Sequence, residues 1–125
     1  KLIQLLSQIQ QTNADVAVIE LGASPLEPYN GDVAYEELKS CVKLAVLCAS
    51  DPYAVYGVMK SFRLRPDIVS GIATNTFAGS ELIEKLCGVK AMNLIDPETG
   101  SELREILSEK LGISLEINHC QEESV

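Results

Sequence analysis

Apolar positions along the chain alternate between helical stripes and short continuous runs. Residues 2–9 place leucine and isoleucine on one helical face, whereas residues 16–21 form an apolar run interrupted only by Glu20. Stripes of the first kind are typical of amphipathic helices, and short apolar runs beside a glycine are typical of strands buried on both faces. The pattern predicts a helix over residues 2–9 and a buried strand over residues 16–21.

The same alternation continues along the rest of the chain. Further strands are predicted over residues 43–49, 66–73, 90–95 and 113–117, and further helices over residues 35–40, 52–62, 77–86 and 97–111. Two of these helices open on Asp-Pro, because Asp caps a helix N-terminus and Pro fits its first position. Apolar strands joined by helices indicate a parallel sheet covered on both faces. The expected fold is a three-layer α/β/α domain with a mostly parallel sheet of four to five strands.

The length and composition fit one globular domain. We expect a single α/β domain over residues 1–118 and a polar tail over residues 119–125. The chain begins at Lys1 within a helical pattern, which suggests the C-terminal part of a larger P-loop-type protein. The formal charge of −8 disfavours nucleic acid as a partner, because an acidic surface repels phosphate backbones. No apolar run approaches 18 residues, so no membrane partner is expected. The four cysteines are not in C-x-x-C spacing and are expected to be reduced thiols in the cytoplasm.

Polar residues follow each predicted strand. In open parallel sheets, ligands bind beyond the carboxyl ends of the strands. The residues expected at that edge are Glu20, Gly22 and Ser24, then Ser50 and Asp51, then Thr74, Asn75 and Thr76, and finally Asn93 and Asp96. They are candidates for binding a nucleotide or a small-molecule substrate.

Glu20 is the strongest catalytic candidate, because a carboxylate in a dry apolar strand is costly unless it is paired or borders a site. It would hold Mg²⁺ or accept a proton from a nucleophile. Asp51 and Asp96 have a simpler alternative as helix caps, and so does the pair Asn75-Thr76. The loop over residues 22–32 is either a plain surface loop or a substrate-side loop whose polar contacts are Tyr29, Asn30 and Asp32.

Several common sites are missing from the sequence. There is no G-x-x-x-x-G-K-[ST] phosphate loop and no G-x-G-x-x-G dinucleotide motif. The single histidine, His119, has no partners at ligand spacing, which disfavours a catalytic triad or a zinc site. A receiver-like domain is disfavoured as well, because no acidic pair follows the first predicted strand.

Four segments in order resemble a conserved P-loop family of unknown function. Residues 19–28, I-E-L-G-A-S-P-L-E-P, resemble its E-G-x-G-x-L-x-x-P segment, and residues 45–52 resemble its apolar strand ending in Asp-Pro. Residues 71–76, G-I-A-T-N-T, are similar to its G-I-x-x-N-T strand end, and residues 96–100 resemble its D-P turn with a following glycine. Leu21 and Ser24 stand where related segments have glycines.

That family is akin to dethiobiotin synthetase, and some members resemble N-acetyltransferases acting on D-amino acids. The resemblance implies a Rossmann-like, P-loop NTPase-like fold with Mg²⁺ and ATP or acetyl-coenzyme A as cofactors. It assigns Glu20 a place near Mg²⁺ and substrate, and Asn75 a contact with adenine.

Two functions from different classes remain open. The first is a nucleotide- or coenzyme-binding domain of a ligase- or transferase-like protein that acts on a small carboxylated substrate. The second is a non-catalytic regulatory or oligomerisation module that keeps the scaffold without a phosphate loop, with a homo-oligomer or an upstream domain of the same protein as partner. Leu21 in place of glycine favours the second.

Overall fold

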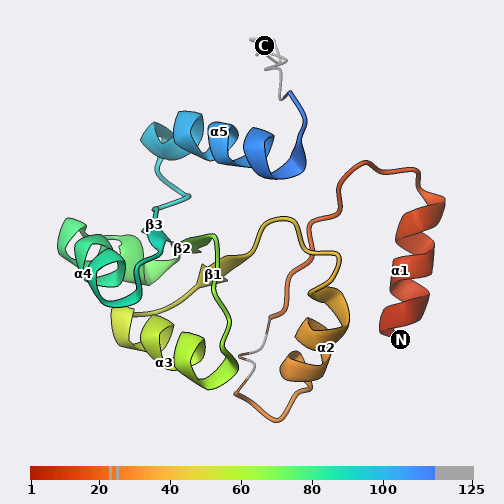
Figure 1. Ribbon diagram of the computed structural model, residues 1–125, viewed down its shortest axis with the longest axis horizontal. Coiled ribbons are helices and arrows are strands. Elements are labelled where there is room, and N and C mark those ends of the chain that lie inside the picture. The colour runs from red at the N-terminus through yellow and green to blue at the C-terminus, as the bar shows by residue number, and fades with distance from the viewer. Residues whose placement is uncertain (23, 25, 115–125) are drawn as a thin grey trace, which may run out of the picture. The chain divides into compact units, whose positions relative to one another are not determined.

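The structure is a computed structural model that describes residues 1–22, 24 and 26–114. The chain forms two compact units, Lys1–Val42 and Lys43–Val125. Figure 1 shows helices α1 and α2 in the first unit, and strands β1 to β3 with helices α3 to α5 in the second. No helix among the described residues is both long and apolar enough to cross a membrane.

The first unit contains the two helices that the sequence predicts. Helix α1 spans Leu2–Gln11, and helix α2 spans Gly31–Leu38. In α1 the half-buried positions Leu2, Leu6 and Ile9 recur at the spacing of one helical face, while the other positions are exposed. Helix α2 begins earlier than predicted, after Asn30 in the left-handed conformation at φ 60°.

The predicted buried strand over residues 16–21 is wrong in this structure. Residues 16–22 belong to no strand, and all of them are exposed, with Val18 at 98%. No backbone hydrogen bond joins this segment to any other described residue. Extended chain becomes a strand only when a neighbouring edge satisfies its N–H and C=O groups, and periodicity cannot supply that neighbour.

The second unit is built on a parallel sheet, as predicted, but the sheet is smaller than predicted. Strands β1 (Val46–Cys48), β2 (Ile68–Ser70) and β3 (Lys90–Ala91) pair in the order β1-β2-β3, with Leu47 opposite Val69. The described residues therefore contain three strands where four to five were predicted. Of the predicted strand over residues 113–117, positions 113 and 114 are not in a strand, and the rest lie outside the described residues.

Helices connect and follow these strands at the predicted places. Helix α3 spans Pro52–Phe62 and helix α4 spans Phe77–Cys87, each between two strands. A 3₁₀ turn, η1 (Ile72–Thr74), precedes α4, and another, η2 (Pro97–Thr99), precedes helix α5 (Gly100–Leu111). Gly88 and Gly112 end α4 and α5 in the left-handed conformation, at φ 62° and 66°.

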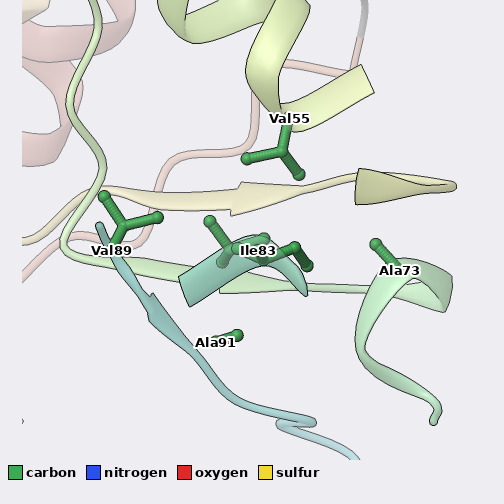
Figure 2. Packing of buried hydrophobic residues seen from close by; sticks show 6 residues of the cluster. Val55, Ala73, Ile83, Val89 and Ala91 are labelled. Carbon is green, nitrogen blue, oxygen red and sulfur yellow. The ribbon is translucent and has the colours of Figure 1, made fainter. Parts of the chain in front are cut away.

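The core of the second unit lies between the sheet and helices α3 and α4. Val55 from α3 and Ile83 from α4 are fully buried against Val69 of β2. Ala73, Val89 and Ala91 complete this cluster, and Figure 2 shows Ile83 in the midst of it. Because neighbouring residues of a strand face opposite sides, Ile68 lies on the other face of β2, and it too is fully buried.

Ion pairs connect helix α5 to the sheet region. Lys90 Nζ lies 2.7 Å from Glu102 Oε1, and Lys110 Nζ lies 2.6 Å from Asp67 Oδ1. The second oxygen of Asp67 accepts a hydrogen bond of 2.8 Å from the backbone N–H of Ala45. None of the residues of α5 is fully buried, but Leu103, Ile106, Leu107 and Leu111 are half-buried, so the ion pairs add to a partly exposed apolar contact.

Replacing Asp67 with alanine should destabilise the second unit in a pH-dependent way. Burial acts to raise the pKa of the Asp67 carboxyl group, but the Lys110 and Ala45 hydrogen bonds outweigh it, so its pKa lies below the ordinary value of 3.8. A group whose pKa is depressed by folding contributes stability above its unfolded pKa and loses it as the pH falls through the folded pKa. We expect Asp67→Ala to cost about 1–2 kcal/mol of unfolding free energy at pH 7, and less at pH 2.5.

Urea unfolding followed by circular dichroism at both pH values measures this difference. Glu36→Ala is the matched control, because it removes an exposed ion pair with Lys39, the residue that follows α2, and should have no measurable effect. A cost of Asp67→Ala that does not change with pH would contradict the prediction.

Candidate functional site at the carboxyl ends of the strands

The carboxyl ends of the three strands form one continuous edge in the second unit. Ala49, just after β1, donates its N–H to the Ser70 carbonyl at 3.1 Å and accepts from the Ala73 N–H at 3.0 Å. Met92, just after β3, donates to the Val69 carbonyl at 2.9 Å. These bonds hold the segments that leave the strands side by side, so polar groups carried on them share one surface.

Gly71 allows two of these segments to approach closely. Its φ is +87°, and a Cβ placed there would lie 2.8 Å from the carbonyl oxygen of Ala49. Only glycine fits both the conformation and the contact without a shift of the backbone. The sequence G-I-A-T-N-T therefore has its glycine for a structural reason, and the edge is tightly built there.

The buried hydroxyl groups at this edge are structural. Ser70 Oγ accepts a hydrogen bond of 3.2 Å from the N–H of Leu94, and Thr74 Oγ1 donates to the Gly71 carbonyl at 2.9 Å. Both side chains are almost completely inaccessible, with 3% and 4% exposure. Thr74, a candidate from the sequence, thus positions the edge and does not face a ligand.

Asp51 acts as the cap of helix α3. Its Oδ1 accepts from the N–H groups of Tyr53 and Ala54, both at 2.9 Å, and its Oδ2 accepts from the Ser50 hydroxyl at 3.0 Å. The Ala54 N–H and then the Ser50 hydroxyl lower the pKa of Asp51, so the carboxylate is ionised at neutral pH. The capping alternative accounts for this residue, and its negative charge occupies the position at α3 where an anion would otherwise be favoured.

Asn75 and Thr76 have different roles, although the sequence placed them together. Thr76 caps helix α4, with its Oγ1 accepting from the Gly79 N–H at 3.1 Å. The Asn75 side chain is exposed and has no hydrogen bond to another described residue. A free amide beside a helix N-terminus offers both a donor and an acceptor to a ligand. Asn75 is therefore the better ligand-binding candidate of the two.

Asp96 is a capping residue of the turn that follows β3. Its Oδ1 accepts from the Glu98 N–H at 3.0 Å, which opens η2. Nearby, the Thr99 hydroxyl donates to the carbonyls of Asn93 and Asp96 at 3.0 and 2.8 Å. Asn93 uses its Oδ1 to accept from the N–H of Ile95 at 3.2 Å. These groups stabilise the turn. The second carboxylate oxygen of Asp96 takes no part in the hydrogen bond to Glu98.

Exposed apolar side chains at the same edge were missed by the sequence reasoning. They lie in the segments and first helical turns that follow the strands and have large exposed fractions: Tyr53 72%, Ile72 70%, Phe77 85% and Ile95 85%. The apolar pattern had placed the last two within a helix stripe and a strand. Their positions in the sequence could have indicated them, because each lies within two residues of a capping side chain or of the glycine that follows β2.

The remaining sequence candidates lie in the first unit. Glu20 is exposed, so its carboxylate does not carry the desolvation cost that singled it out in the sequence. Ser24 Oγ accepts from the Leu26 N–H at 3.2 Å, and Glu27 Oε2 accepts from the Ser24 N–H at 2.8 Å, which makes this a local turn. Gly22 is exposed beside them. The catalytic and binding roles of these three residues stay predictions.

The loop residues of the first unit are exposed, as a surface or substrate-side loop requires. Tyr29 has 70% exposure, Asn30 precedes α2, and Asp32 lies in the first turn of that helix. Among the described residues, no three His, Cys, Asp or Glu side chains gather as a metal-binding group. His119 and Cys120 lie outside those residues.

Comparison with known protein families, with curated proteins and with solved structures finds no match to this chain.

Proposed function

We propose that the chain is a nucleotide- or coenzyme-binding α/β domain of a P-loop ligase- or transferase-like protein that acts on a small carboxylated substrate. The observation that carries the proposal is the carboxyl edge of β1 to β3, where the segments after the strands carry four exposed apolar side chains and the Asn75 amide, which has no hydrogen bond to another described residue. The three-layer arrangement with four to five strands and the cytoplasmic location belong to the same proposal.

The apolar residues of this edge favour a flat organic ligand. Large apolar side chains with 70% exposure or more leave apolar area in contact with water. Two of them, Ile72 and Phe77, lie on either side of the exposed Asn75 in the sequence. Ligand sites are typically lined by apolar and aromatic groups with a few polar groups that fix orientation. A nucleobase fits this combination, because its face can stack on Phe77 while its edge exchanges hydrogen bonds with the Asn75 amide.

The helix N-termini indicate where the phosphate groups of a bound nucleotide or coenzyme would lie. Helices α3 and α4 both begin at this edge, and a helix N-terminus favours negative charge. At α3 the ionised Asp51 already fills that position, whereas the cap of α4 is the neutral Thr76. Phosphate groups are therefore expected at the start of α4, and a Mg²⁺ ion bound with them would be attracted by the Asp51 carboxylate.

Ligand titration tests the proposal. Two-dimensional NMR of the chain with Mg-ATP, and separately with acetyl-coenzyme A, should shift the amide signals of residues 50, 51, 53, 72–77 and 93–96 in a saturable way. If neither ligand moves these signals, the proposed function is wrong.

Phe77→Ala should weaken ligand binding without changing stability. Loss of a base-stacking aromatic is expected to weaken binding about tenfold. Phe77 is 85% exposed, so the unfolding free energy should change by less than about 0.5 kcal/mol. Leu86→Ala is the matched control, because Leu86 is an exposed apolar residue at the opposite end of the same helix. Equal affinities of the two variants for Mg-ATP would contradict the role of Phe77.

The second candidate, a non-catalytic regulatory or oligomerisation module, is favoured by the same exposed apolar side chains. Four of them on one edge also suit a protein partner. Under this alternative, Phe77→Asp should shift the chain from oligomer to monomer in light-scattering chromatography, and Glu20→Ala should leave the activity of the parent protein intact. A large loss of turnover with Glu20→Ala would favour the enzyme.

A further inference from the structure

A small pocket lies where helices α3 and α4 end, away from the carboxyl edge at which both helices begin. Its volume is about 210 Å³, and its lining residues are Tyr56, Met59, Lys60, Arg65, Leu86 and Cys87. The two helices pack on each other in the core, so the pocket is part of the second unit alone. None of these residues takes part in the function proposed above.

Two cationic side chains line this pocket, and neither forms an ion pair with a carboxylate of the described residues. Arg65 Nη2 donates to the Gly88 carbonyl at 2.6 Å, which fixes the guanidinium group across the end of α4. Lys60 Nζ lies 5.4 Å from the centre of the Tyr56 ring. Among the described residues, the carboxylates that form ion pairs do so with Lys39, Lys90 and Lys110, not with Lys60 or Arg65. Seven of the ten basic residues form no ion pair with a described residue, so what distinguishes Lys60 and Arg65 is that both line the same pocket.

Helix capping explains only part of this arrangement. Lys60 lies in the last turn of α3, where a cation is favoured by the negative end of the helix dipole. Arg65 lies beyond the helix, and most of its five N–H donors remain available after the bond to Gly88. The convergence of both cations on one cavity is what points to an anionic ligand.

The rest of the pocket lining is apolar and favours an organic anion. Met59 is half-buried, and Tyr56 and Leu86 are exposed to 43% and 44%. The volume is below the range of about 300–1,000 Å³ for drug-sized ligands. We propose that this pocket binds a small organic carboxylate, with the carboxylate on Arg65 and Lys60 and the hydrocarbon part on Met59, Leu86 and the Tyr56 ring.

Cys87 provides a built-in reporter of occupancy. Its thiol is half-buried, and burial raises its pKa while the charge of Lys60 acts in the opposite direction. A bound carboxylate would cover the thiol and neutralise Lys60, and both effects reduce its reactivity. Cys48 lies on β1 and is exposed, so it serves as an internal reference thiol.

The test uses hexanoate, its neutral analogue hexanamide and inorganic phosphate as probes. We expect hexanoate to shift the NMR signals of residues 56–60, 65 and 86–88 and to slow alkylation of Cys87 by iodoacetamide, with no effect on Cys48. Hexanamide lacks the charge and phosphate lacks the hydrocarbon part, so both should bind more weakly. Equal binding of hexanamide or phosphate would overturn the proposal.

Charge-removing variants test the two cations separately. Lys60→Gln and Arg65→Gln should each weaken hexanoate binding about tenfold, as expected for loss of one charge-assisted contact. Arg104→Gln, on the exposed side of α5, is the control and should bind as the parent chain does. Arg65→Gln also removes the bond to Gly88, so Lys60→Gln decides the outcome if the Arg65 variant is poorly folded. Unchanged binding by Lys60→Gln would overturn the proposal, and Mg-ATP titration of the same variant keeps this result separate from the carboxyl edge.

Discussion

Replacing Ile83 with alanine is expected to cost about 2–5 kcal/mol of unfolding free energy, the largest effect that we predict. Ile83 has no exposed surface, and it lies at the centre of the cluster that α4 forms with Val55, Val69 and Ala91. Truncation to alanine leaves a cavity between α4 and the sheet. The neighbouring Val55 and Val69 are fully buried and already packed in the same cluster, so they cannot move to fill it. Chemical denaturation followed by circular dichroism measures the loss.

Phe77→Ala is the control on the same helix. It removes a larger side chain from a position with 85% exposure, so its cost should be below about 0.5 kcal/mol. If the two variants lose similar stability, Ile83 does not occupy the core of the second unit.

Gly79→Ala and Gly57→Ala are expected to change stability in opposite directions, although the chemical change is the same. A Cβ at Gly79 would lie 2.4 Å from the carbonyl oxygen of Ala73 and 3.1 Å from Thr76 Oγ1. The carbonyl is backbone and cannot move aside freely, so we expect a loss of about 1–3 kcal/mol. At Gly57, inside α3, no atom lies within 4 Å of the added Cβ, and we expect a gain of about 0.5–1 kcal/mol from helix propensity.

Thermal unfolding of the two variants measures the effect. The loss in Gly79→Ala should also disturb the Thr76 cap, since the Gly79 N–H is its donor. The amide signal of residue 79 should therefore move in the spectrum of the folded variant. Stabilisation by Gly79→Ala would show that η1 and α4 do not approach each other closely.

The elements that were located correctly from the sequence are those determined by contacts between residues close in the chain. Asp51 and Pro52 open α3, Thr76 opens α4, and Gly88 ends it, as cap preferences predict. A cap needs only the N–H or C=O groups of the next few residues, and these are present in any chain with that sequence. The boundaries of α3 and α4 were therefore accurate to within about one residue.

The strands were predicted less well because their partners are distant in sequence. Residues 66–73 became a short strand and a 3₁₀ turn, because Gly71 packs against Ala49, which lies 22 positions earlier. Residues 16–21 have the composition of a buried strand, yet Val18 is almost fully exposed. The composition of a segment shows that it could pair as a buried strand, but it does not determine whether another strand lies beside it.

The candidate site shows the same division. Its polar residues Asp51, Asn75, Thr76 and Asp96 were identified from sequence, because parallel strands deliver their following residues to one edge. The sequence did not decide that three of them are used as caps while the Asn75 side chain bonds to no other described residue, since a cap and a ligand contact require the same side chains. It also did not reveal the pocket at the other end of α3 and α4, where Arg65 and Cys87 are brought together from separate parts of the chain.

The sequence by itself thus determined the parallel α/β class, the helices with their caps, and the polar residues that follow each strand. Only the tertiary structure decided which apolar residues are buried, which polar groups are used in helix caps, and which cations line the same pocket. The physical reason is range: helix caps and periodicity depend on contacts within a few residues, whereas strand pairing, burial and charge pairing depend on groups that folding brings together from far along the chain.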